Sequence, residues 1–108
     1  SGQEVELPTQ VLKIKDQNPL SGYRIRYKIV DGPEANLITP KEVRTGRATE
    51  ATAITGEDGL ARIKIAQPAE TAGTNTVLVE VLKPDPAKPG EFLLIADYKT
   101  KVTWQAPQ

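Results

Sequence analysis

The chain contains no cysteine, methionine or histidine. The absence of cysteine excludes disulfides and thiolate zinc sites, and it fits either a reducing compartment or a bacterial exterior built without disulfides. Without histidine, the chain lacks the usual general base and the side chain that titrates near neutral pH. A Ser-His-Asp triad is therefore excluded, and the only serines are Ser1 and Ser21.

The chain also lacks an excess of either charge and any long apolar run. Fourteen Lys+Arg balance fourteen Asp+Glu, so no overall field attracts nucleic acid, and we expect no nucleic-acid partner. No run of about 18 apolar residues is present, so we expect no direct membrane insertion. At 108 residues and 38% hydrophobic, the chain suits one domain with a modest core.

Turn chemistry and alternating residues dominate what is present. Asp58-Gly59 opens an alternating segment, which is typical of a narrow hairpin turn. The segment 23–30 alternates strictly and predicts a strand with Tyr23, Ile25, Tyr27 and Ile29 facing inward. We expect further strands over residues 10–15, 36–38, 48–54, 60–66, 75–82 and 92–104.

The last expected strand is too long to be regular. Its apolar phase runs through Leu94, Ala96, Tyr98, Thr100, Val102 and Trp104. A bulge or a sheet switch near Leu93–Ile95 would reconcile that phase with the apolar run at its start.

About seven short strands separated by turn signals predict an all-β, immunoglobulin-like antiparallel β-sandwich. We interpret residues 1–9 as a tag remnant with an N-terminal linker, 10–104 as the domain and 105–108 as a C-terminal linker. Neighbouring domains of the same chain are then expected partners.

The same residues resemble a known family. The turn Asn18–Gly22, the strand 23–30 and a Thr-x-x-Asp-Gly-x-Ala motif are similar to those of bacterial immunoglobulin-like domains of the invasin/intimin type. Thr55, Asp58, Gly59 and Ala61 supply the motif, and Gly73 with Val77 match a later Gly-x-x-x-Val stretch. The resemblance extends from about Val11 to Val81. It implies a spacer or adhesion module at an extracellular or cell-surface (envelope) location.

Two sets of side chains are candidates for ligand binding. Arg24, Arg26 and Lys28 form an outward row, joined by Lys13 and Lys15 if their strand is a neighbour. A local basic face of this kind suits an acidic glycan or nucleic acid. Like charges on a wet strand also guard against edge pairing. Trp104 with Tyr98 could form a sugar platform, although their common phase favours core or inter-domain packing for Trp104.

The loop carboxylates leave two further alternatives open. Glu57, Asp58, Asp85 and Glu91 could supply an acid-base pair, and oxygen ligands for calcium could come from Asp16, Asn18 and Asp31 or from Glu57, Asp58 and Asp85. Each of these residues also has an explanation as a turn residue. We expect no enzyme activity, no metal and no cofactor.

The sequence therefore predicts a non-catalytic structural spacer or adhesion module of a larger bacterial surface or exported protein. The alternative is a carbohydrate- or protein-binding β-sandwich that uses its end loops, with residues 34–46 and 84–89 as the best candidates.

Overall fold

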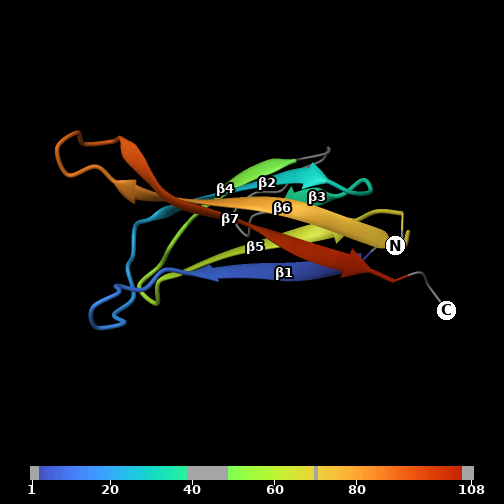
Figure 1. The fold of residues 1–108 in the computed structure, drawn as a ribbon, viewed down its shortest axis with the longest axis horizontal. Coiled ribbons are helices and arrows are strands. Elements are labelled where there is room, and N and C mark those ends of the chain that lie inside the picture. Colours follow the sequence, from blue (N-terminus) through green and yellow to red (C-terminus); the bar gives the residue numbers. More distant parts are fainter. Residues whose placement is uncertain (1–2, 39–48, 70, 106–108) are drawn as a thin grey trace.

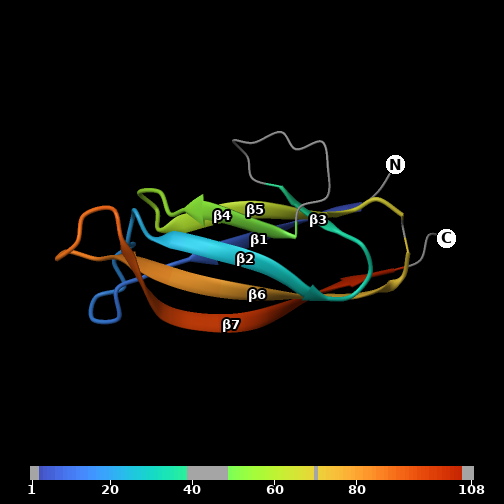
Figure 2. The same cartoon turned by 90° about the horizontal axis from the view of Figure 1, so that it is seen from above.

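The computed structural model describes residues 3–38, 49–69 and 71–105, which form a β-sandwich of seven antiparallel strands (Figures 1 and 2). The strands are β1 (Gln3–Gln10), β2 (Arg24–Asp31), β3 (Asn36–Ile38), β4 (Glu50–Ile54), β5 (Leu60–Gln67), β6 (Gly73–Pro84) and β7 (Phe92–Trp104). One sheet has the order β1-β5-β3, and the other has the order β4-β2-β6-β7. The predicted fold class is confirmed. No helix in the described part of the chain could cross a membrane.

Alternating side chains of the central strands build the core between the sheets. Ile25 and Tyr27 of β2 are fully buried, as the alternation predicts, and they face Val81 and Val79 of β6. The second sheet contributes Ile63 and Ile65 from β5 and Leu37 from β3. Burial of these aliphatic side chains is the main favourable term in folding, at about 25 cal/mol for each Å² of apolar surface removed from water.

The N-terminal segment corrects the sequence interpretation. Residues 3–10 are not a linker but strand β1, which pairs with β5 along its whole length. Pro8 is tolerated because β1 is an edge strand, where one row of backbone N–H groups faces solvent. The expected strand over 10–15 is wrong, because this segment runs into a turn in which Gln17 N–H donates to Lys13 O at 2.8 Å.

The Asp58-Gly59 turn forms as predicted locally, but it does not close a hairpin. It joins β4 of the four-stranded sheet to β5 of the three-stranded sheet. Gly59 has a φ of 75°, and a Cβ at this position would lie 2.7 Å from Val11 O. The turn therefore needs glycine both for its backbone angle and for the close approach of the 11–23 loop.

Of the two irregularities predicted near Leu93–Ile95, a bulge or a sheet switch, the structure has the bulge. Val81 pairs with Ala96 and Leu82 with Leu94, so Ile95 is the extra residue. Because a bulge shifts the side-chain alternation by one residue, Leu94 lies on the outer face of the sheet instead of sharing the inward phase of Ala96. The expectation that Leu94 shares one phase with Ala96 and Trp104 is therefore wrong.

The described ends of the chain lie at one pole of the sandwich, which we call the terminal pole (Figure 1). Gln3 Nε2 donates a long hydrogen bond of 3.4 Å to Gln105 O. The opposite end, the loop pole, carries the connections 11–23, 55–59 and 85–91. The two loops favoured as binding loops divide between the poles: 84–89 lies at the loop pole, and the start of 34–46 lies at the terminal pole. Residues 39–46 fall outside the described residues.

Candidate functional site

The predicted basic row lies on the outer face of the four-stranded sheet, but acidic residues interrupt it. Arg26 Nε donates to Glu80 Oε1 at 2.7 Å, and Lys28 lies opposite Glu50 in the β2–β4 ladder. Lys13 and Lys15 do not join the row, because they belong to the 11–23 loop and the neighbours of β2 are β4 and β6. The face is therefore mixed in charge and not a continuous basic strip.

Arg24 has a different environment from the other two basic residues. Its guanidinium group lies 4.0 Å from the centre of the Phe92 ring, which is cation–π geometry. Arg24 Nε is buried and has no hydrogen-bond partner among the described residues. The phenyl ring of Phe92 thus holds the Arg24 guanidinium group at the start of β2, and the Nε–H donor of Arg24 remains unused.

Apolar side chains from the other three strands of the sheet surround Arg24 on the outer face. Ile54 and Leu82 are its cross-strand neighbours, and Leu94 is the next residue along the same row. Ile54 and Leu94 are each 52% exposed. We call Arg24, Ile54, Leu82, Phe92 and Leu94 the apolar corner, which lies at the end of the sheet nearer the loop pole.

The sequence analysis missed most of the apolar corner. Arg24 was singled out for its charge alone, and Leu94 was placed in the same phase as Ala96 and Trp104. The signal that could have found the corner is the bulge itself, because shifting the alternation at Ile95 moves Leu94 and Phe92 onto the face of Arg24.

Trp104 is a core residue and is 3% exposed. Its Nε1–H donates to Asn75 Oδ1 at 2.7 Å, while Asn75 Nδ2 donates to the backbone oxygens of Asp31 and Pro33 at 3.1 and 2.8 Å. This buried network ties the end of β7 to β6 and to the connection after β2. Of the two roles favoured for Trp104, core or inter-domain packing, the structure shows the core role, and the indole face is not presented to a sugar.

Tyr98 stands apart from Trp104 on the inner face of β7. It lies opposite Val79, which is 1% exposed, but Tyr98 itself is 46% exposed. Six residues along a strand span about 20 Å, so the two aromatic side chains do not form one platform. The three-stranded sheet does not cover this part of β7.

Four of the loop carboxylates accept hydrogen bonds within their own turns, namely Asp16, Asp31, Asp58 and Asp85. Asp16 Oδ1 accepts from Asn18 N–H at 3.1 Å and Asp85 Oδ1 from Ala87 N–H at 2.9 Å, which confirms the turn role predicted for Asp16. Asp58 accepts from Leu60 N–H at 3.0 Å, and this bond, with a smaller effect from Arg62, lowers the pKa of Asp58. Within the described ranges, no three acidic side chains gather at a geometry for a metal ion.

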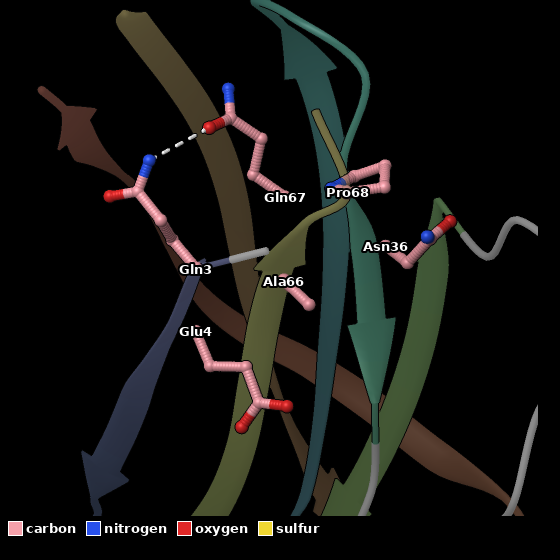
Figure 3. Close-up of a pocket in the computed structure, with 6 residues that line it drawn as sticks. All are labelled: Gln3, Glu4, Asn36, Ala66, Gln67 and Pro68. Atoms are coloured by element: carbon pink, nitrogen blue, oxygen red, sulfur yellow. Dashed lines mark hydrogen bonds between the residues drawn. The ribbon is translucent and has the colours of Figure 1, made fainter. Parts of the chain in front are cut away.

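A depression of about 440 Å³ at the terminal pole is lined by Gln3, Glu4, Asn36, Ala66, Gln67 and Pro68 (Figure 3). Its carboxamides serve the fold: Gln67 donates to Thr71 O at 2.6 Å and accepts from Thr71 N–H at 2.9 Å and from Gln3 at 3.2 Å. Glu4 points away from this pair (Figure 3) and lies 3.6 Å from Lys64 Nζ. The lining groups therefore do not converge on a common point.

Comparisons with known proteins do not place the chain in a family. No protein-family model matches it, and no curated protein and no solved structure matches it.

Proposed function

We propose that this protein is a non-catalytic adhesion module of a larger bacterial surface or exported protein, and that it presents the apolar corner to a protein partner. The observation that carries the proposal is the position of the corner. It lies toward the loop pole, while both described ends of the chain lie at the terminal pole. A parent chain attached at those ends would hold the corner away from its own body.

The chemistry of the corner suits a protein ligand. Arginine and aromatic residues are enriched among the side chains that dominate protein–protein affinity, and they act best when surrounding contacts exclude water. Here Arg24 is fixed on Phe92, so little side-chain entropy is lost on binding. Exposed Ile54 and Leu94 flank the pair and supply apolar surface.

The position of the chain ends favours presentation over an in-line spacer role. β1 and β7 are edge strands, each paired with one neighbour among the described strands. Force applied to ends at one pole would open the β1–β5 and β6–β7 ladders from that end, one hydrogen bond at a time. A spacer resists mechanical unfolding better when force shears its strands, because all the hydrogen bonds of a ladder then bear the force together. The resemblance to bacterial immunoglobulin-like domains supports an exported parent protein for either role.

A peptide selection tests the proposal directly. A random-peptide display library is selected on the immobilised protein, and binding of the selected peptides is compared between wild type, Leu94→Asp and the matched control Val30→Asp. Val30 is also an exposed strand aliphatic, at 44%, but it lies near the terminal end of β2. We expect Leu94→Asp to weaken binding about thirtyfold or more, as loss of an interface hot spot does, and Val30→Asp to leave it unchanged.

The glycan alternative is tested in the same series. The labelled protein is applied to an array of acidic and neutral glycans. A glycan that binds the protein at least as tightly as the peptides, or peptides that bind Leu94→Asp and wild type equally, would contradict the proposal.

A further inference from the structure

The free edge of β7 carries an unused interaction surface. β7 is 13 residues long and pairs only with β6 within the described part of the chain. Figure 2 shows it at the border of the four-stranded sheet. A long edge strand offers a row of backbone N–H and C=O groups to any strand that can lie beside it.

The inner face of this edge is incompletely covered. The opposing sheet has three strands against four, and β1 and β7 separate toward the loop pole (Figure 1). Trp104 is therefore buried near the terminal pole, whereas Tyr98 is 46% exposed in the middle of the strand. An aromatic ring on the core-facing side of a sheet normally has a partner, and here nearly half of the Tyr98 surface is left uncovered.

We propose that two copies of this chain associate by antiparallel pairing of β7 with β7, with Tyr98 of each copy opposite Tyr98 of the other. Charge complementarity favours this register over those centred on the neighbouring charged residues. Asp97 of each copy then lies opposite Lys99 of the other, on the outer face, so a twofold axis produces two opposite-charge pairs. Ala96 lies opposite Thr100, and the paired segment begins just after the bulge at Ile95.

The registers centred on Asp97, Lys99 and Thr100 fail on the same residues. In a twofold antiparallel pair, one residue always lies opposite its own copy. Centring the pair on Asp97 or on Lys99 brings two like charges together, and centring it on Thr100 places Lys99 opposite Lys101. Like charges directly opposite each other destabilise a strand pair, whereas opposite charges and aromatic pairs stabilise it. The arrangement centred on Tyr98 has both favourable features.

A peptide strand could use the same free backbone groups, but it would have no built-in match to the alternation of Asp97 and Lys99. The exposed lysines also oppose pairing with an uncharged strand. In a second copy, Asp97 lies opposite each Lys99 and neutralises its charge. Lys99 therefore disfavours pairing with other strands but permits pairing with a second copy of β7. The result is a continuous eight-stranded sheet across the two copies.

Charge exchange gives the decisive test. Sedimentation equilibrium at about 100 mM salt compares wild type with Asp97→Lys, with Lys99→Asp and with the double exchange. We expect wild type to dimerise and each single variant to dimerise at least about tenfold more weakly, because both pairs change from attraction to repulsion. The double exchange restores dimerisation, and an equimolar mixture of the two single variants forms a heterodimer.

A cross-link provides a second readout, because a disulfide traps the paired state covalently and reports which residues lie opposite each other. Because the chain has no cysteine, Tyr98→Cys introduces one thiol, and opposite residues of a strand pair lie close enough for a disulfide. We expect a covalent dimer under mild oxidation from Tyr98→Cys and not from the control Thr103→Cys, which is exposed on the same strand. A wild type that stays monomeric at every concentration up to about 1 mM, or a double exchange that fails to restore pairing, overturns the proposal.

Discussion

Replacement of Asn75 by alanine is expected to remove a large part of the protein's stability. The side chain is fully buried and makes three hydrogen bonds, one from Trp104 and two to the backbone oxygens of Asp31 and Pro33. Alanine leaves all three partners without the amide. A buried polar group that loses its only partner costs about 1–3 kcal/mol, and two of these three contacts are only partly buried.

The expected total for Asn75→Ala is about 3–5 kcal/mol. Domains of this size are stable by about 5–15 kcal/mol, so the variant should stay folded but be clearly weakened. With a urea dependence of about 1.5 kcal/mol per molar, the unfolding midpoint should fall by about 2–3 M. Far-UV circular dichroism follows unfolding of the whole domain, and emission from Trp104, the only tryptophan, should shift to the red in the folded variant.

Asn18→Ala is the matched control, because it makes the same chemical change in an exposed turn. It should alter stability by about 0.5 kcal/mol or less. If Asn75→Ala lost less than about 1 kcal/mol, or if the two variants lost equal amounts, the network around Trp104 would not hold the end of β7 as argued.

Three further predictions concern the fold. Burial raises the pKa of Tyr27 to about 12, although a hydrogen bond with Thr9 acts in the opposite direction. Since the phenol ionises near 10 in the unfolded chain, the free energy of unfolding should fall by roughly 2–3 kcal/mol between pH 10 and 12. Tyr27→Phe should flatten this part of the pH profile of urea unfolding. Gly59→Ala should cost about 2–4 kcal/mol of stability, because φ is left-handed and the added Cβ would lie 2.7 Å from Val11 O. Gly90→Ala, at a φ of 86° in open space, should cost only about 1–2 kcal/mol. Equal losses of the two variants in thermal unfolding would refute the close approach at Gly59. Thr55→Val should cost about 1–3 kcal/mol in the same assay, because Thr55 Oγ1 donates to Leu20 O at 2.7 Å and accepts from Tyr23 N–H at 2.9 Å. An unchanged melting temperature would show that these two hydrogen bonds do not stabilise the fold.

The sequence predicted the elements whose signal is local. Strict alternation located β2 and its buried face, the three-residue strand β3 was placed correctly, and the bulge in β7 followed from an apolar run that no regular alternation accommodates. In each case neighbouring residues along the chain carry the information, because side chains alternate across a strand with a period of two.

Strand pairing could not be predicted in this way. In immunoglobulin constant domains the first strand lies beside the second, whereas here β1 pairs with β5. The Asp58-Gly59 turn looks like a hairpin turn because its backbone angles are those of a tight turn, but the choice between closing a ladder and crossing to the other sheet depends on distant contacts. One of these is the hydrogen bond from Val11 N–H to Gly59 O, at 2.8 Å.

The candidate site was predicted only in part, for a related reason. Charge drew attention to Arg24, but its aromatic partner Phe92 is 68 positions away along the chain and reaches it only through the β2–β6–β7 pairing. The exposure of Tyr98 likewise depends on the width of the opposing sheet. Neither property is encoded in the residues adjacent to these side chains.

The most direct test of the proposed function is the map of backbone amide shifts when a selected peptide is added to the isotopically labelled protein. The account predicts that the largest changes cluster at Arg24, Ile54 and 92–94, on the outer face near the loop pole. Changes that cluster instead around Gln3, Asn36 and Gln67, at the pole where the described ends lie, would contradict it.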